Sequence, residues 1–356
     1  MKRALFLLVL LNLLIVGSAL AQATTPESTA EAAAKWQQIP VDGAICARGT
    51  PYSFYFHEGN PNKLMVYFQG GGACWNAETC KVGGPFDDSV KPGELDRYGG
   101  IFNFAHADNP IADYSVVVVT YCTGDVHTGS ATRTFSSGGA DFTIHFNGFT
   151  NAQAVLKWTF AHFEHPSSLI VTGSSAGAYG AIFNAPYVLS HYPDAKAVVF
   201  GDAGIGVMAP GWDGLSTWGT AQNRFNAPAY QSVTPTSDLT NGLYGAAAQT
   251  FPQASVAEYT SFTDATQTGF YKLQGGDPKD WSAGMQSKLS ALDQLPNFHS
   301  YIGWGSLHTI LPTPLFYLMQ VNGESFRDWF AKLISGATVS DVQCQNCSAV
   351  EIAPSS

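Results

Sequence analysis

Residues 171–180 read Val-Thr-Gly-Ser-Ser-Ala-Gly-Ala-Tyr-Gly, and the predicted fold depends on this stretch. The apolar residues 169–171 are typical of a short buried strand, and the alanine-rich residues after the turn favour a helix. A strand, a sharp turn and a helix are the context of a G-x-S-x-G nucleophile elbow, which lifts the hydroxyl of Ser175 clear of the sheet edge. The pentapeptide alone is weak evidence, so this interpretation depends on the rest of the chain.

The remaining sequence alternates between segments that predict strands and segments that predict helices. Antiparallel leading strands are expected within residues 45–56, and further strands at 63–68, 114–121, 168–172, 197–200, 256–262 and 298–304. Helices are expected over 149–164, from the elbow to about 191, and over about 324–335. Long loops are expected over 83–112 and 123–146, and a long elaboration between core strands over about 205–250. This order predicts an α/β fold with a mostly parallel central sheet and helices on both faces.

The first residues have the pattern of a cleavable secretory signal. Lys2 and Arg3 precede an apolar stretch at 4–16, and Ala19-Leu20-Ala21 is an A-x-A cleavage site. The apolar stretch holds about a dozen residues, which is too short for an easy membrane span. We therefore expect secretion or export to a periplasm. The expected parts are a signal peptide, a mobile leader and a single catalytic domain, over residues 1–21, 22–40 and 41–356.

Composition indicates a folded protein and argues against two classes of partner. Hydrophobic residues make up 45% and charged residues 12% of the chain, as in a globular protein and unlike a disordered one. The formal charge is −10 and no basic tract is present. Nucleic acids and anionic lipid surfaces are therefore poor candidates as partners.

Export would place the six cysteines in an oxidising compartment, where an even number suggests disulfides. Cys74 and Cys80 can close a small loop, and Cys344 and Cys347 a smaller one. That leaves Cys46 and Cys122 to pair with each other. A zinc site is disfavoured because the C-x-x-C at 344–347 has no second pair and no nearby histidine. We expect no metal and no cofactor.

A serine nucleophile needs a base to take its proton, and the base needs an acid to orient it. In α/β-hydrolases the order along the chain is serine, acid, histidine, on loops after successive strands. After Ser175 only three histidines remain: His191, His299 and His308. His191 ends the elbow helix and His299 starts a strand, whereas His308 follows the carboxyl end of a strand. The sequence therefore predicts His308 as the base.

Two aspartates follow predicted strands and could serve as the acid. Asp264 lies between nucleophile and base, immediately before the last strand unit, and is favoured. Asp202, in Gly-Asp-Ala-Gly at 201–204, is the alternative acid, and it could instead support the site or cap a turn.

Acyl transfer also needs hydrogen-bond donors for the developing oxyanion. One expected donor is the backbone N–H of Ala176, which follows the nucleophile. Others are the N–H groups of Gly71 and Gly72, in the glycine turn after the strand at 63–68. Aromatic residues of the elaboration could wall an acyl or sugar pocket, although such residues are more often core: Trp212, Trp218, Phe225, Tyr230 and Tyr244.

Three stretches carry a family resemblance. They are Gln-Gly-Gly-Gly-Ala-Cys-Trp-Asn at 69–76 with Cys80, Tyr-Cys-Thr-Gly-Asp-Val-His-Thr-Gly at 121–129, and residues 173–180. Together they resemble the pectin acetylesterase/Notum family of secreted serine carboxylesterases with an α/β-hydrolase fold. The resemblance covers about 41–130 and 168–204, and is weaker over 255–311.

The resemblance implies the same site residues that the order of residues along the chain predicts. Residues 263–267 resemble the segment that bears the family's acid, and His308 lies where its histidine is expected. This implies a Ser175, Asp264 and His308 triad. Members of the family remove acetyl groups from pectin or a fatty acyl group from a protein, which implies an acyl ester or acylated polysaccharide as substrate.

The expected activity is hydrolysis of acetyl or other acyl esters through an acyl-enzyme. Two other functions are compatible with the same residues: an inactive hydrolase fold used for binding, and an acyltransferase or peptidase built on the same triad.

Overall fold

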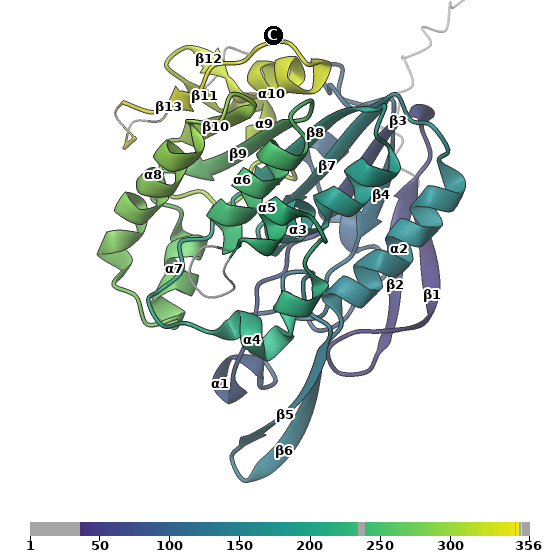
Figure 1. Cartoon of the computed structure of the whole chain (residues 1–356), viewed down its shortest axis with the longest axis vertical. Helices are drawn as coiled ribbons and strands as arrows, with labels where there is room; N and C mark the ends of the chain where they lie inside the picture. The colour runs from purple at the N-terminus through teal and green to yellow at the C-terminus, as the bar shows by residue number, and fades with distance from the viewer. Residues whose placement is uncertain (1–35, 234–238, 346, 349, 351–356) are drawn as a thin grey trace, which may run out of the picture. The chain divides into compact units, whose positions relative to one another are not determined.

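A nine-stranded sheet forms the centre of the computed structural model, which describes residues 36–233, 239–345, 347, 348 and 350 (Figure 1). In spatial order its strands are β1 (Gln37–Ile45), β2 (Pro51–His57), β4 (Tyr114–Val119), β3 (Asn60–Phe68), β7 (Ser168–Ser174), β8 (Lys196–Asp202), β9 (Ser255–Ser261), β10 (Phe298–Gly303) and β13 (Val342–Gln343). The β1–β2 and β2–β4 pairs are antiparallel, and every other neighbouring pair is parallel. The prediction of a mostly parallel sheet is confirmed.

Helices pack on both faces of this sheet. The described residues form the α-helices α1 (Ala77–Cys80), α2 (Gly148–His162), α3 (Ala176–His191), α4 (Gly214–Trp218), α5 (Pro228–Gln231), α6 (Leu239–Thr250), α7 (Ala265–Leu273), α8 (Trp281–Leu292), α9 (Leu315–Leu318) and α10 (Phe326–Ser335). Successive side chains of a strand point to opposite faces. On β8, Phe200 contacts Phe330 of α10, whereas a Cβ at Gly201 would lie 1.8 Å from the Tyr244 hydroxyl of α6. The helices α6 and α10 therefore cover opposite faces.

The parallel strands have the continuous apolar sequence expected of strands covered on both sides. All six residues of β4 are buried, including four consecutive valines, as are the last five residues of β3. Because the packed strands hold their ends in place, the turns that follow these ends also have defined positions.

Two local expectations are wrong. The predicted loop at 123–146 contains a hairpin of β5 (Ala131–Ser137) and β6 (Ala140–Phe146), which extends away from the central sheet (Figure 1). Its many Ser and Thr residues are typical of loops, but they alternate with residues such as Phe135 and Ile144, which is the period of a strand. Residues 37–40 of the predicted leader belong to β1. The segment at 205–250 lies between the core strands β8 and β9, as expected of an elaboration, and contains the helices α4, α5 and α6. The predicted signal peptide lies outside the described residues.

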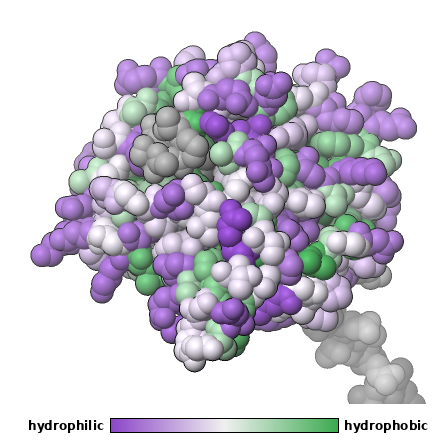
Figure 2. All heavy atoms as spheres, turned by 60° about the horizontal axis from the view of Figure 1, so that its bottom comes forward, coloured by the Kyte–Doolittle hydropathy of each residue, from purple (hydrophilic) through white to green (hydrophobic). Residues whose placement is uncertain are grey.

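Disulfide bonds join Cys46 to Cys122, Cys74 to Cys80 and Cys344 to Cys347, which are the expected pairs. The first ties the end of β1 to the loop after β4, and the second closes the segment around α1. In the view of Figure 2, most of the surface consists of hydrophilic and intermediate residues, with apolar residues in small separate groups. Within the described ranges, no helix has the length and apolar character that crossing a bilayer requires.

Candidate active site

Five neighbouring parallel strands bring the predicted site residues to one edge of the sheet. The carboxyl ends of β3, β7, β8, β9 and β10 are in register, since Phe68 pairs with Gly173, Ser174 with Asp202, and Ser261 with Gly303. Gly72, Ser175, Asp202, Asp264 and His308 lie, in the same order, at these ends or shortly after them. The carboxyl edge of a parallel sheet is the usual place for a ligand site.

Ser175 occupies a strained turn between β7 and α3. Its backbone has φ 58° and ψ −125°, a conformation that non-glycine residues rarely adopt. Its N–H donates to the carbonyl of Asp202 at 2.7 Å, which holds the turn against β8. Gly177 lets the turn approach β3, because a Cβ there would lie 1.9 Å from the carbonyl oxygen of Phe68. These features are those of the predicted nucleophile elbow.

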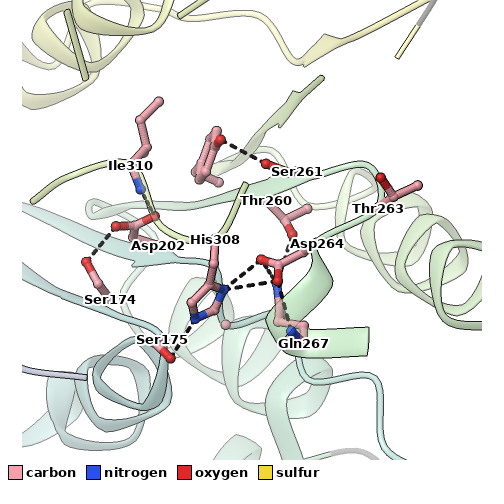
Figure 3. Close-up of polar contacts among 12 residues, drawn as sticks. Ser174, Ser175, Asp202, Thr260, Ser261, Thr263, Asp264, Gln267, His308 and Ile310 are labelled. Carbon is pink, nitrogen blue, oxygen red and sulfur yellow. Dashed lines mark hydrogen bonds and ion pairs between the residues drawn. The ribbon is translucent and has the colours of Figure 1, made fainter. Parts of the chain in front are cut away.

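His308 contacts both Ser175 and Asp264 (Figure 3). Its Nε2 lies 2.7 Å from Oγ of Ser175, and its Nδ1 lies 2.8 Å from Oδ2 of Asp264. The Asp264 side chain is fully buried and that of His308 is 21% exposed. A carboxylate can only accept at neutral pH, so the neutral imidazole carries its proton on Nδ1 and leaves Nε2 to accept from the serine hydroxyl.

Gln267 fixes the orientation of the Asp264 carboxylate, and the sequence analysis missed it. Asp264 is the N-cap of α7, where its Oδ1 accepts from the backbone N–H of Gln267 at 2.8 Å. The Gln267 side-chain amide donates to Oδ2 of Asp264 and to the hydroxyl of Thr260, both at 3.0 Å. Aspartate followed three residues later by glutamine is a helix-start signal, and this pattern could have identified Gln267.

Asp202, the alternative acid, binds backbone and a serine hydroxyl and does not contact the imidazole. Its carboxylate accepts from the N–H of Ile310 at 2.8 Å and from the Ser174 hydroxyl at 2.5 Å (Figure 3). It also accepts from the N–H of Leu311 at 3.0 Å. Burial raises the pKa of Asp202 from its ordinary 3.8 to about 6, and these donors oppose the rise.

These bonds explain how His308 reaches Ser175. The histidine follows β10, which lies three strands from β7, a separation of about 14 Å at the usual strand spacing. The loop after β10 must therefore run back across the ends of β9 and β8, and Asp202 at the end of β8 binds it there. The other two histidines lie elsewhere: His191 stacks on Phe160 at the far end of α3, and His299 lies near the start of β10.

A cleft opens beside Ser175. Gly72 and Ala176, two of the expected oxyanion donors, line it together with Ser175 and His308, whereas Gly71 is absent from its described lining. The N–H of Ala176 is the first of helix α3 and has no acceptor within the helix.

Most of the cleft wall is aromatic or aliphatic. Trp212 and Trp218 of the elaboration line it, but Phe225, Tyr230 and Tyr244 pack elsewhere in the core. Aromatic residues outside the elaboration also contribute and were not predicted from the sequence: Trp75, Tyr179, Phe270, Tyr271 and Trp281. Across residues 36–233 and 239–345, no group of three or more His, Cys, Asp or Glu side chains is arranged to bind a metal ion.

Comparisons with known proteins identify the family. Two crystal forms of the Wnt deacylase Notum from Drosophila superpose with TM-scores of 0.61 and 0.63 at 16% and 15% identity. They cover 87% of this chain and 96% and 97% of Notum, so the fold is that of an α/β-hydrolase. A palmitoleoyl-protein carboxylesterase, notum1' of Xenopus laevis, is 26% identical over 171 residues, which is 45% of this chain and 34% of that relative's length. Residues 28–261 match the model of the pectinacetylesterase family. The chain therefore belongs to the pectinacetylesterase family of carboxylic ester hydrolases.

Proposed function

We propose that this protein is a secreted serine carboxylesterase that hydrolyses acetyl or other acyl esters through a Ser175, His308 and Asp264 triad. The observation that carries the proposal is the pair of contacts made by one imidazole, 2.7 Å to the Ser175 oxygen and 2.8 Å to the Asp264 carboxylate. Both distances are in the range of good hydrogen bonds. Membership of a family of ester hydrolases supports the same assignment.

In the proposed acylation step, Nε2 of His308 takes the proton of the Ser175 hydroxyl while the oxygen attacks the ester carbonyl carbon. The carbonyl π electrons move onto oxygen, and the N–H groups of Ala176 and Gly72 stabilise this oxyanion. The buried Asp264 carboxylate stabilises the imidazolium that forms. The imidazolium then gives its proton to the departing alcohol oxygen as the tetrahedral intermediate collapses to the acyl-enzyme.

Deacylation repeats these steps with water in place of the serine. His308 takes a proton from a water molecule, whose oxygen attacks the acyl carbon, and returns the proton to Oγ of Ser175 as the bond between Oγ and the acyl carbon breaks. The 21% exposure of the His308 side chain supports this role, because water must reach the imidazole. The products are a carboxylic acid and the free enzyme.

The proposed substrate is an acyl ester whose acyl part enters the aromatic cleft. Its wall is mainly apolar, so burial of a hydrocarbon chain there is favourable. The similar proteins are named for removing acyl groups, a palmitoleoyl group in one case and a Wnt acyl group in the other. An acylated polysaccharide is the second substrate class that the family description suggests.

Proposed export rests on the residues at 1–21 and on the three disulfides, since disulfides persist in oxidising compartments.

Hydrolysis of p-nitrophenyl acetate and octanoate by the wild type and by Ser175→Ala tests the proposal. We expect turnover of at least one ester by the wild type and a loss of about 10⁴-fold or more in Ser175→Ala, because the nucleophile is gone. Absence of turnover on any ester, with the variant indistinguishable from the wild type, would instead indicate a binding protein. Release of acid from acetylated pectin and acetylated xylan then separates the substrate classes.

A further inference from the structure

The turn after β3 contains three consecutive glycines, Gly70 to Gly72, and this inference rests on the proposed use of the Gly72 N–H as an oxyanion donor. Glycine has more backbone freedom than any other residue, so a donor on such a turn stays aimed only if other groups hold it. Gly72 cannot be replaced by a stiffer residue. Its φ is 75°, and a Cβ would lie 2.0 Å from the carbonyl oxygen of Pro85.

The peptide group before Gly72 is held by a backbone donor. The carbonyl of Gly71 accepts from the N–H of Asp87 at 2.8 Å. Because a trans peptide is planar, the N–H of Gly72 points away from that carbonyl, and so away from Asp87. Gly72 lines the cleft beside Ser175, which is where an oxyanion donor is needed.

The peptide group after Gly72 is held by the phenol of Tyr121. The Tyr121 hydroxyl donates to the Gly72 carbonyl at 2.8 Å and accepts from the N–H of Val126 at 3.0 Å. The N–H at the other end of this peptide, that of Ala73, donates to the Pro85 carbonyl at 3.1 Å. The dihedral angles of Gly72 are therefore constrained from both sides.

The tyrosine that makes this bond is itself immobilised. Its side chain is almost completely buried, and its ring lies against the glycine turn, since a Cβ at Gly71 would be 2.5 Å from Cδ1 of Tyr121. Its backbone N–H donates to Oε1 of Gln69 at 3.0 Å. Burial raises the pKa of Tyr121 well above its ordinary value, so the phenol keeps the proton that it donates.

We propose that Tyr121 is a positioning residue for the reaction: its hydroxyl binds the Gly72 carbonyl and so keeps the Gly72 N–H aimed at the oxyanion that forms when Ser175 attacks the ester. Tyr121 itself contacts neither the substrate nor the reacting atoms. Its contribution is preorganisation of a donor in a segment that has no side chains of its own.

Tyr121→Phe tests this inference, because it keeps the ring and removes only the hydroxyl. We expect kcat for p-nitrophenyl acetate to fall about 10- to 100-fold, somewhat less than loss of an entire oxyanion donor, with KM changed less than about threefold. The inhibition constant of a trifluoromethyl ketone, which forms an oxyanion adduct with the nucleophilic serine, is expected to rise in parallel with the loss of kcat/KM. Rates are expressed per site titrated with a phosphonate, so that unfolded protein is not counted.

Tyr192→Phe is the matched control. Tyr192 is also buried and its hydroxyl donates to a backbone carbonyl, that of Phe163, at 2.8 Å, but it lies at the far end of α3 from Ser175. We expect it to lose thermal stability as Tyr121→Phe does, with kcat near that of the wild type. Equal kcat values in the two variants would overturn the inference. Equal activity of wild type and Ser175→Ala would instead overturn the proposed function.

A second replacement covers the case in which Tyr121→Phe does not fold. Incorporation of 3-fluorotyrosine at position 121 keeps the ring and the hydroxyl while making the phenol a stronger donor. We expect kcat to change while Tm and KM stay at their wild-type values, and the same replacement at Tyr192 to leave kcat unchanged. An unchanged kcat at position 121 would contradict the positioning role.

Discussion

At the scale of single residues, the buried aspartates at the end of β8 and after β9 have different environments and therefore different expected roles. Asp264 accepts from the imidazole of His308 and from Gln267, whereas Asp202 accepts from backbone N–H groups and the Ser174 hydroxyl. The sequence favoured Asp264 from its position in the chain order. The sequence could not show which of the two aspartates contacts His308, because this contact depends on how the loop after β10 folds back over the sheet.

Asp264→Asn is expected to lower kcat about 10⁴-fold while leaving the protein folded. The amide of asparagine can donate to Nδ1 of His308, which places the imidazole proton on Nε2 and blocks proton transfer from Ser175. The control is Asp113→Asn, which changes an exposed carboxylate paired with Lys63. Kinetics with p-nitrophenyl acetate measure both variants, and a kcat of Asp264→Asn close to the control would remove Asp264 from the triad.

His127 is expected to make the protein less stable as the pH falls. It is fully buried with Nε2 2.8 Å from the Gln69 carbonyl, and burial lowers its pKa from 6.5 to about 4. Between these values the unfolded chain binds the proton and the folded chain does not. The free energy of unfolding therefore falls as the pH decreases from about 6.5 to 4, by about 3 kcal/mol for this group.

His127→Gln isolates this contribution, because Gln keeps an N–H donor but does not titrate. The comparison is needed because Asp125 and Asp202, whose pKa values burial raises to about 6, act with the opposite sign over the same range. Urea unfolding at several pH values measures the difference between the two proteins. If the difference in the free energy of unfolding between wild type and variant does not depend on pH, the histidine is not buried in its neutral form.

At the scale of elements, strands that are buried on both faces could be read from the sequence, and polar elements could not. The four valines of β4 and the apolar residues of β7 before the elbow predict buried strands, because a short continuous apolar run is typical of such a strand. The β5–β6 hairpin was missed because most of its outward residues are polar and many are Ser and Thr, which are also frequent in loops. The aromatic residues of α7 and α8 that line the cleft were missed because only the fold brings them beside Ser175.

The junction of β7 and α3 is expected not to tolerate a side chain at Gly177. In Gly177→Ala the new Cβ would overlap the Phe68 carbonyl, so the elbow or β3 must shift. We expect a loss of stability of at least about 1–3 kcal/mol and a large loss of esterase activity. Chemical unfolding and p-nitrophenyl acetate kinetics measure the two effects.

Gly269→Ala is the matched control, since a Cβ at this position of α7 meets no atom within 4 Å. Alanine is the better helix former, so this variant should be as stable as the wild type or more stable by about 0.5–1 kcal/mol. If both alanine variants behaved alike, close packing at the elbow would not explain the glycine.

At the scale of the whole molecule, the net charge of the protein affects which polysaccharides the enzyme could approach. Removal of residues 1–21 would leave 15 basic residues against 27 acidic ones, a formal charge of −12. Such a protein repels a polyanion such as pectin at low ionic strength. A neutral acetylated polymer is not repelled.

We therefore expect kcat/KM on acetylated pectin to rise about two- to tenfold between 10 and 150 mM salt, because salt screens the repulsion. The rate on acetylated xylan should stay constant over the same range. Titration of released acetate measures both reactions. A rate on pectin that falls with added salt would indicate a local positive surface at the cleft that outweighs the net charge.

The double use of Asp202 has a consequence for thermal motion. Its carbonyl holds the peptide of Ser175, and its carboxylate holds the backbone two and three residues beyond His308. We therefore expect vibration of the β8 tip to carry Oγ of Ser175 and Nε2 of His308 along together, so that their separation varies less than either position. Anisotropic displacement parameters from a high-resolution crystal should accordingly have similar amplitudes and directions for these two atoms.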